Sequence, residues 1–340
     1  MYSFRNDYSE GAHPRVLQRL IDTNLEQTCG YALDPMSDAA RETIRRVCAA
    51  PAADVHFVSG GTQTNLLTIA AFLRPYEAVI APTTAHISLH EAGAIEATGH
   101  KVCAVETPDG KLTAEMVAAV ADSHTDEFMV RPRMVYVSDS TELGTIYTKA
   151  ELTALRRCCD QRGLCLFLDG ARLGSALTAP GNDLTLPDLA ALTDAFYIGG
   201  TKNGALFGEA LVLRQPMERF RWHMKQRGAI LAKGRAMALQ FQALLEDGLY
   251  FEIARHANET ALRLRDGMME LGYEFPIPSP SNQQFPVLPN TVARQLEEMG
   301  YQFEAERVID EEHTCVRFVT SWATPQSAVD EFLRDLAKCR

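Results

Sequence analysis

The sequence predicts an α/β fold with a mainly parallel central sheet and a smaller C-terminal α+β domain. From about residue 54 to residue 213, short apolar runs alternate with helical patterns, as expected for strands connected by helices. These runs are apolar at almost every position, which is typical of strands with both faces covered. The pattern changes after about residue 240. We therefore expect a large domain over residues 1–240, which includes the N-terminal segment, and a small domain over residues 241–340.

Seven apolar runs are the predicted strands of the large domain. In chain order they read DVHFVSGGT (54–62), AVIAPTT (78–84), KVCAVET (101–107), RMVYVSDST (133–141), LCLFLDGAR (164–172), AFYIGGT (195–201) and EALVLR (209–214). Segments between them, such as TNLLTIAAFL (64–73) and TAEMVAAVAD (113–122), repeat apolar residues three and four apart and predict helices. Ligands bind at the carboxyl ends of strands in such sheets. Polar residues at those ends are therefore the first candidates for a functional site.

The C-terminal part predicts a different arrangement. Residues 251–272 form an amphipathic helical pattern that ends at Gly272, and the segment PIPSPSNQQFPVLPN (276–290) is a connector interrupted by proline. A strand candidate, TCVRFVTSW (314–322), and a last helix over residues 325–339 follow. This order of elements indicates a small α+β domain.

Composition and charge exclude several classes of partner. The formal net charge of −11 and the absence of a basic run argue against nucleic acid and anionic membranes. No apolar stretch approaches the roughly 20 residues that span a bilayer, and the first residues, MYSFRNDYSEG, lack the features of an export signal. The eight cysteines show no metal-ligand spacing, so reduced thiols are expected and a metal site is not. These features predict a cytoplasmic protein.

Three polar features follow predicted strands. The turn SGGTQTN (59–65) opens a helix, so its N–H groups and Thr62 can hold a phosphate, although such turns also occur for geometry alone. Asp169 ends a very apolar strand, where a carboxylate needs a cation or hydrogen-bond donors; it either caps the next turn or pairs with Arg172. Lys202 lies in the glycine-flanked turn GGTKNG, unless it simply points to solvent.

Together these features match what pyridoxal phosphate requires from a protein. Lys202 would form an imine with the cofactor, Asp169 would keep the pyridine nitrogen protonated, and the glycine turn would bind the phosphate. The glycines beside Lys202 would make room for the cofactor ring. Burial and neighbouring cations would lower the pKa of Lys202 and keep its amine neutral.

A histidine follows another strand in TTAHISLHEAGA (83–94). His86 is placed to lie flat on the cofactor ring and to reach substrate protons, or else to serve as a structural residue at a helix N-terminus. His90 and Glu91 follow it, and no role is assigned to Glu91.

At this point the sequence resembles a known family. SGGTQTN, AHISLHEAG, STELGTIY, LDGARL, GGTKNGALFGEA and VRFVTSW occur in the order and spacing found in low-specificity L-threonine aldolases. That family belongs to the fold-type-I pyridoxal-phosphate enzymes, within the aromatic amino-acid β-eliminating lyase and threonine aldolase group. The resemblance extends from FRNDYSEG to the C-terminal helix, and it implies a fold-type-I architecture of the transferase-like kind.

The resemblance assigns roles to individual residues. Lys202 matches the Schiff-base lysine, Asp169 the partner of the pyridine nitrogen, and His86 the histidine that stacks on the ring. Gly61 and Thr62 match the phosphate turn.

Two arginines and a subunit boundary complete the carried-over site. Arg172 and Arg317 match the arginines that hold the substrate carboxylate, which a planar guanidinium binds through two hydrogen bonds; a surface ion pair is the alternative for Arg317. The family implies a homotetramer of dimers with active sites shared between subunits. Lys233 would then reach the phosphate bound in a neighbouring subunit.

Two positions depart from the family pattern. Asn6 stands where many members have a serine near the substrate carboxylate, and Phe128 stands where many have a histidine that contacts the substrate β-hydroxyl. The second difference affects the expected preference between threo and erythro substrates. His124 is a candidate substitute for the missing histidine.

The resemblance implies retro-aldol cleavage of L-threonine, L-allo-threonine or a related β-hydroxy-α-amino acid into glycine and an aldehyde. The carboxylate held by Arg172 and Arg317 would orient the Cα–Cβ bond, and His86, or a water that it orders, would take the β-hydroxyl proton. The alternatives are a β-eliminating lyase acting on serine or cysteine, or an amino-acid racemase, on the same scaffold. A non-catalytic scaffold is a third reading, against which Lys202 and Asp169 argue.

Overall fold

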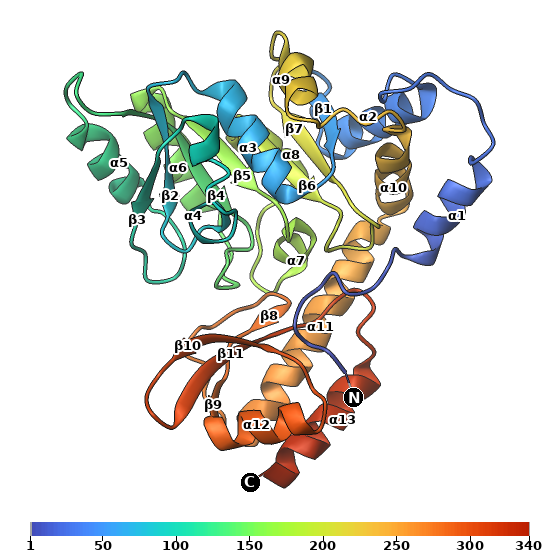
Figure 1. Ribbon diagram of the computed structural model, residues 1–340, viewed down its shortest axis with the longest axis vertical. Helices are drawn as coiled ribbons and strands as arrows, with labels where there is room; N and C mark the ends of the chain where they lie inside the picture. The colour runs from blue at the N-terminus through green and yellow to red at the C-terminus, as the bar shows by residue number, and fades with distance from the viewer. Residues whose placement is uncertain (1, 340) are drawn as a thin grey trace.

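A seven-stranded sheet forms the centre of the larger part of the molecule in the computed structural model, which describes residues 2–339 (Figure 1). The strand order is β1-β7-β6-β5-β4-β2-β3. Strands β6, β5, β4, β2 and β3 run parallel to one another, whereas β7 is antiparallel to both β1 and β6. The strands are β1 Asp54–Val58, β2 Glu77–Pro82, β3 Val102–Val105, β4 Arg131–Ser138, β5 Cys165–Asp169, β6 Ala195–Gly199 and β7 Glu209–Leu213. The predicted mainly parallel sheet is confirmed.

Two layers of apolar side chains cover the two faces of this sheet. On one face, side chains such as Val135, Leu168 and Ile198 share a core with helices α2, α5, α6, α8 and α10. On the other face, Met134, Phe167 and their neighbours pack with α3, α4 and α9. Strand β3 lies at the edge and is only partly buried, so the expectation that every strand is covered on both faces is wrong for β3. The helices are α2 Pro35–Val47, α3 Gly61–Phe72, α4 His86–Leu89, α5 Ala114–Ser123, α6 Lys149–Arg162, α8 Leu186–Leu192, α9 Phe220–Gln226 and α10 Arg235–Leu245.

Local sequence signals fix the ends of several helices. The Thr148 side chain accepts from the N–H of Glu151, whose carboxylate accepts from the N–H of Thr148, and this capping box begins α6. The same helix ends at Gly163, whose φ of 64° lies in the left-handed region. A second capping box, Thr185 with Asp188, begins α8.

The smaller part has its own sheet and core. Helix α11 (Leu249–Glu270) extends from the larger part into the smaller one, and Gly272 follows its end as the sequence predicts (Figure 1). The small sheet has the order β10-β11-β8, with β9 also paired to β11. The remaining elements of the smaller part are β8 Gln283–Gln284, β9 Val287–Pro289, α12 Asn290–Glu298, β10 Glu304–Val308, β11 His313–Val319 and α13 Gln326–Leu336. The boundary at residues 240 and 241 stays a prediction.

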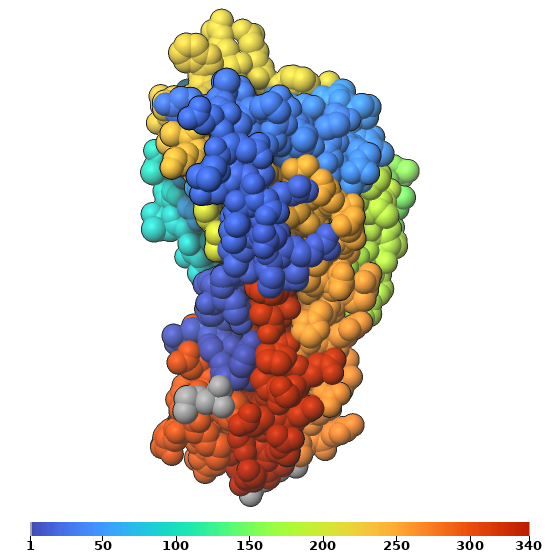
Figure 2. All heavy atoms as spheres, turned by 90° about the vertical axis from the view of Figure 1, so that its right-hand side faces the viewer, coloured from blue at the N-terminus to red at the C-terminus, as the bar shows by residue number. Residues whose placement is uncertain are grey.

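The N-terminal segment connects the two parts. Phe4 is fully buried in the core of the small part, and its N–H and carbonyl pair with Gln302 and Val319. The chain then runs into α1 (Pro14–Asp22), which packs against α10. Figure 2 shows the blue N-terminal residues along this face, beside the red C-terminal residues. Residues between Phe4 and α1 therefore lie at the junction of the two parts.

Candidate active site

One pocket of about 540 Å³ lies at the carboxyl ends of β5 and β6. The first turn of α3 and the helix α4 also border it. Most of the predicted site residues line it. They are Gly61, Thr62, His86, Asp169, Arg172, Lys202 and Arg317, together with Tyr8, Ser59, Gly60, Asn65, His90, Glu142, Ala171, Tyr197, Thr201, Phe207 and Glu209. The small part contributes Arg317 from β11, so the pocket lies between the two parts.

Lys202 follows β6 after a turn of two residues and faces the pocket. Burial lowers the pKa of its amine, and the charge of Arg172 lowers it further against the opposing charges of Asp7, Glu142 and Asp169. Among residues 2–339, no group forms a hydrogen bond or ion pair with the Lys202 amine. The lowered pKa favours the neutral amine, which is the form that acts as a nucleophile.

Glu209 fixes the turn that carries Lys202. Its carboxylate accepts hydrogen bonds from the N–H of Gly200 at 3.0 Å and from the hydroxyl of Thr201 at 2.9 Å. Burial raises the pKa of Glu209 to about 8. The turn before the lysine is thus held by a side chain from the next strand.

The glycines beside Lys202 serve backbone packing, which corrects the sequence-based expectation that they make room for a cofactor ring. A Cβ on Gly199 would lie 2.5 Å from the carbonyl oxygens of Gly170 and Ala171. A Cβ on Gly200 would lie 2.7 Å from the carbonyl oxygen of Gly208. Both distances are too short for real atoms, so the ends of these strands approach one another only because side chains are missing.

Asp169 ends β5 and is almost fully buried. Its Oδ1 accepts from the N–H of Ala171 and the hydroxyl of Tyr197, and its Oδ2 accepts from Asn65 Nδ2 and the hydroxyl of Tyr136. The predicted turn cap is therefore present, whereas Arg172 pairs with another residue. Burial and the charge of Asp169 raise the pKa of both tyrosines well above the usual value, so both phenols stay protonated donors.

These contacts define how Asp169 would receive a pyridine nitrogen. A carboxylate has about four acceptor positions, and protein donors use all of them here. A ring N–H at this position would share or replace one of the donors. Three of the four donors, on Asn65, Ala171 and Tyr197, belong to residues that line the pocket, whereas Tyr136 does not line it.

The first turn of α3 offers N–H groups without side-chain caps. Gly60 is the N-cap residue, and no side chain accepts a hydrogen bond at this helix start. A Cβ on Gly61 would lie 3.1 Å from the hydroxyl of Tyr197, so a larger residue would crowd the pocket. The free N–H groups, the helix dipole and Thr62 suit an anion such as a phosphate.

His86 begins α4 and is partly exposed in the pocket. Its Nδ1 lies 2.8 Å from Oε1 of Glu91, whose side chain is fully buried. Burial lowers the pKa of His86, but the hydrogen bond to Glu91 and the charges of Glu142 and Asp169 outweigh burial and raise it overall.

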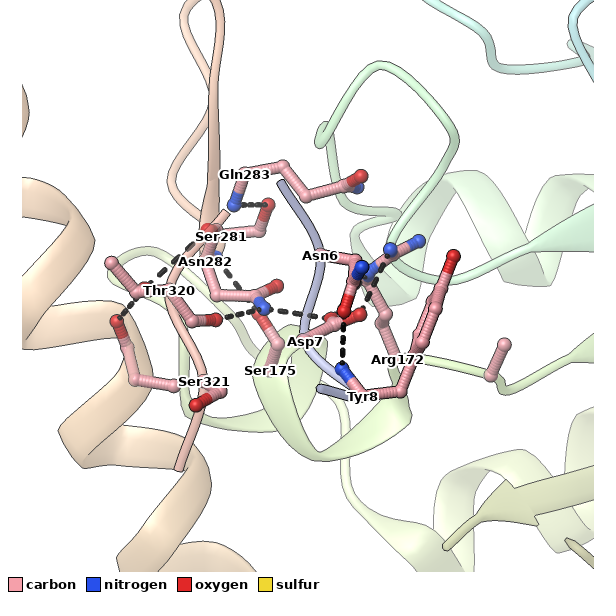
Figure 3. A network of polar contacts seen from close by, with 12 residues as sticks. Asn6, Asp7, Tyr8, Arg172, Ser175, Ser281, Asn282, Gln283, Thr320 and Ser321 are labelled. Atoms are coloured by element: carbon pink, nitrogen blue, oxygen red, sulfur yellow. Dashed lines mark hydrogen bonds and ion pairs between the residues drawn. The ribbon is translucent and has the colours of Figure 1, made fainter. Parts of the chain in front are cut away.

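Arg172 is held by a carboxylate from the N-terminal segment. Its Nε and Nη2 donate to Asp7 at 2.8 and 3.1 Å, and both side chains are buried. Asp7 also accepts from Asn282 Nδ2 at 2.9 Å (Figure 3). Asp7 thus joins the N-terminal segment, the large part and the small part in one contact.

The other predicted carboxylate ligands differ in placement. Arg317 lines the pocket, and its Nη1 lies 3.1 Å from Oε1 of Glu306, so the predicted ion pair is also present. The Oδ1 of Asn6 accepts from the N–H of Tyr8 and the hydroxyl of Ser9, and Asn6 does not line the pocket (Figure 3). The substrate contact of Asn6 stays a prediction.

Three residues predicted near the site lie elsewhere in this chain. Lys233 is exposed beside a separate pocket between residues 20–30 and α10, so a role at the site needs the neighbouring subunit. Phe128 is 92% exposed, and His124 Nδ1 lies 2.8 Å from the carbonyl oxygen of Val120. Neither lines the pocket, so His124 does not replace the missing histidine within one chain.

Several site residues were not found from the sequence. Four of them, Asp7, Asn65, Tyr136 and Tyr197, bind Arg172 or Asp169 directly. A fifth, Glu209, binds the turn before Lys202. Tyr136 and Tyr197 lie inside apolar strand runs and read as core residues. The other three lie within segments quoted for the family resemblance: Asp7 in FRNDYSEG, Asn65 in SGGTQTN and Glu209 in GGTKNGALFGEA.

The described residues offer neither a metal cluster nor a membrane-spanning helix. The side chains of residues 2–339 form no group of three or more His, Cys, Asp or Glu suited to a metal ion. In the same residues, no helix has the length and apolar character needed to cross a membrane.

The family model for beta-eliminating lyases matches residues 4–290. The chain, with its α/β fold and its pocket at the strand ends, therefore belongs to this family. A Thermus thermophilus aspartate aminotransferase mutant, 18% identical, shares the fold with a TM-score of 0.73 and covers 99% of this chain and 96% of its own. The predicted fold-type-I architecture is therefore confirmed.

Two matches narrow the class. A low-specificity L-threonine aldolase of Pseudomonas aeruginosa is 31% identical over 338 residues, which cover 98% of this chain and 96% of that protein. The structure of a threonine aldolase from Leishmania major is 45% identical with a TM-score of 0.98, and the match covers 99% of each chain. The chain belongs to the low-specificity L-threonine aldolase family, as the sequence resemblance predicts.

Proposed function

We propose that this protein is a pyridoxal-phosphate-dependent aldehyde-lyase that cleaves L-threonine, L-allo-threonine or a related β-hydroxy-α-amino acid into glycine and an aldehyde. One observation carries the proposal. The unpaired amine of Lys202 shares a pocket with the buried Asp169 carboxylate, the free N–H groups of α3 and the guanidinium groups of Arg172 and Arg317. Family membership supports the carbon–carbon bond cleavage.

The pocket residues fit the cofactor. Lys202 would hold its aldehyde carbon, Asp169 its ring nitrogen, and the first turn of α3 with Gly61 and Thr62 its phosphate. When bound, pyridoxal phosphate withdraws electrons from the substrate Cα and so supplies the sink for the electrons of the broken bond.

The two arginines orient the substrate. A carboxylate bound by Arg172 and Arg317 is held from both parts of the molecule at once. Asp7 keeps the Arg172 guanidinium fixed through Nε and Nη2, which leaves Nη1 for the substrate. A carboxylate fixed in this way sets which bond at Cα is presented for cleavage.

His86 would accept the proton of the substrate β-hydroxyl, directly or through a water. Its Nδ1 faces Glu91, so Nε2 is the nitrogen left for this step. Removal of that proton drives cleavage of the Cα–Cβ bond and release of the aldehyde.

Reduction with borohydride, followed by digestion and mass spectrometry, tests the cofactor attachment. A pyridoxyl label is expected on the peptide that carries Lys202, and Lys202→Ala should lose it. Lys101→Ala, at an exposed lysine outside the pocket, is the matched control and should keep the label on Lys202. A label on another lysine, or none, contradicts the proposal.

Product analysis separates the aldolase from the β-eliminating lyase and the racemase. L-Threonine should give acetaldehyde and glycine, whereas elimination from L-serine or L-cysteine would give pyruvate, and racemisation would give the D-amino acid. The match to the beta-eliminating lyase model makes the pyruvate assay the necessary comparison. Pyruvate without acetaldehyde would overturn the aldolase assignment.

We also propose that the enzyme works in the cytoplasm as a homotetramer whose subunits share active sites. All eight cysteines lie within the described residues and are free thiols, which suits a reducing compartment. Lys233 lies outside the active-site pocket of its own subunit and would then reach the phosphate bound in the neighbouring subunit. Analytical ultracentrifugation tests the tetramer; a monomer with full activity would contradict it.

A further inference from the structure

Glu91 occupies an unusual position behind the pocket. It follows α4, and its side chain is fully buried although it carries a carboxylate. Its Oε1 receives two contacts, from His86 Nδ1 and from Asn65 Nδ2, each at 2.8 Å. Its Oε2 has no hydrogen-bond partner among the described residues. A buried carboxylate in such surroundings is costly, which points to a role for Glu91 beyond stability.

Asn65 links this carboxylate to Asp169. The same Nδ2 that donates to Glu91 also donates to Asp169 Oδ2 at 3.0 Å. An amide nitrogen has two hydrogens, so each carboxylate receives one. The opposite amide orientation would turn the Asn65 oxygen toward two carboxylates and is excluded by repulsion. His86, Glu91, Asn65 and Asp169 thus form one continuous chain of hydrogen bonds from α4 to the end of β5.

The chain of contacts also fixes the proton on His86. A carboxylate offers only acceptors, so the hydrogen between His86 and Glu91 is on Nδ1. The neutral ring then has its lone pair on Nε2, on the side away from Glu91. The His90 ring, whose centre lies 5.6 Å from that of His86, has no such anchor among the described hydrogen bonds.

We propose that Glu91 is a positioning residue for His86. It holds the imidazole in the Nδ1–H form with Nε2 free to accept the substrate proton, while Asn65 ties the Glu91 carboxylate to the carboxylate of Asp169. This inference rests on the proposed function for the use made of Nε2. The hydrogen-bonded pair itself can be tested without any catalysis.

The charges around His86 give the expected direction. Glu91, Glu142 and Asp169 favour the charged imidazole, and Lys202 opposes it. Tyr136, which also feels the charge of Glu91, stays protonated because burial raises its pKa. Loss of the Glu91 charge should therefore lower the pKa of His86, by about one unit or more for an opposite charge in direct contact.

Hydrogen–deuterium exchange at the imidazole C2 position, read by mass spectrometry, gives the pKa of each histidine in the full-length holoenzyme. The wild-type midpoint for His86 is expected above 6.5, the usual value. In Glu91→Gln, which keeps the volume and removes the charge, the midpoint should fall by about one unit or more. Glu91→Asp, which keeps the charge, should restore part of this difference.

Glu77→Gln is the matched control. Glu77 is also a buried carboxylate, but it accepts a hydrogen bond from the N–H of Arg74 and has no contact with His86. This variant should leave the His86 midpoint unchanged. A wild-type midpoint below 6.5, or an equal midpoint in Glu91→Gln and wild type, would overturn the inference. The wild-type measurement decides the case even if the variant does not fold.

Kinetics separate the two proposals. If His86 is the proton acceptor, the acidic limb of the kcat/KM profile should move to lower pH in Glu91→Gln, with a lower kcat and a KM changed less than kcat. A His86 midpoint that differs between wild type and Glu91→Gln, in a protein that forms no acetaldehyde, would support the His86–Glu91 pair and reject the proposed function. Aldolase activity with the same His86 midpoint in both proteins would support the proposed function and reject the role of Glu91.

Discussion

Asp7 neutralises and positions Arg172, the arginine that is proposed to bind the substrate. Burial alone raises the pKa of Asp7, but the charges of Arg172 and Lys202 outweigh it and hold the pKa below the usual 3.8. Arg172 is buried too, so neither charge has water as a substitute partner. The pair therefore acts as a unit, in which removal of one charge leaves the other exposed to a low dielectric.

Asp7→Ala should lower the free energy of unfolding by about 3–5 kcal/mol, because it leaves the buried guanidinium of Arg172 without an opposite charge. Urea denaturation measures this change. KM should also rise, since Arg172 loses the anchor of Nε and Nη2. Equal stability and equal KM in wild type and variant would contradict the role of Asp7 in holding Arg172.

Asp7→Asn tests the pH dependence of the same pair. A carboxylate with a lowered pKa in the folded state contributes its full stability above the pKa of the unfolded chain, about 3.8, and loses it as the pH falls through the lower folded value. The stability difference between wild type and Asp7→Asn should thus be constant at neutral pH and shrink below about pH 4. A difference that grows in acid would reverse the assigned sign.

At the scale of elements, the ends of β5 and β6 meet without side chains between them. Gly170 and Gly199 allow this, since a Cβ on Gly170 would lie 1.8 Å from the carbonyl oxygen of Tyr197. The close approach aligns Asp169 and Lys202 at neighbouring strand ends. Backbone packing thereby sets the spacing of the two groups that would hold the cofactor.

Gly199→Ala should cost about 3 kcal/mol or more, because its Cβ would overlap two carbonyl oxygens that belong to a rigid turn. Thermal and urea unfolding measure the loss. Gly11→Ala is the matched control, since a Cβ there meets no atom within 4 Å, and it should leave stability nearly unchanged. Similar unfolding curves for the two variants would show that the strand ends can separate.

At the scale of the whole molecule, the N-terminal segment holds the two parts together. Phe4 fills the core of the small part, and three residues later Asp7 binds Arg172 of the large part and Asn282 of the small one (Figure 3). The pocket lies at this junction, with Arg317 on one side and Lys202 on the other. Because Asp7 holds Arg172, the proposed substrate ligand, we expect substrate binding to depend on the packing of Phe4, which does not line the pocket.

Phe4→Ala should lower the free energy of unfolding by about 3–5 kcal/mol, as for other buried phenylalanines. Because it also loosens the segment that carries Asp7, KM should rise while the pyridoxyl label on Lys202 persists. Phe4→Leu, which keeps most of the buried volume, should show much smaller changes in both. A destabilised Phe4→Ala enzyme with an unchanged KM would separate the segment from substrate binding.

The sequence predicted the groups that end apolar strands, and it missed the groups that bind them. Lys202 and Asp169 stand out because a charge after an apolar run is rare, and the parallel topology places such ends together. Asp7 and Arg172 are 165 positions apart, and no pattern within either segment announces the other. Tyr136 and Tyr197 look like strand core, because periodicity reports burial and not the hydroxyl at the tip of the ring.

One sequence-based interpretation was corrected by the structure. The glycines of GGTKNG suggested space for a ligand, yet carbonyl oxygens of neighbouring segments lie where side chains of Gly199 and Gly200 would be. His124 lies outside the pocket of its own chain, where its Nδ1 contacts the carbonyl oxygen of Val120, so its role stays a prediction. A sequence gives residue types and spacing, whereas contact partners depend on the fold.

The contact of Asp7 with Asn282 also bears on synthesis by the ribosome. The acid is translated 275 residues before its amide partner. A nascent chain must therefore keep the segment around Asp7 unattached to the small part until Asn282 has left the ribosome. During that interval, chaperones would encounter this segment without its partners.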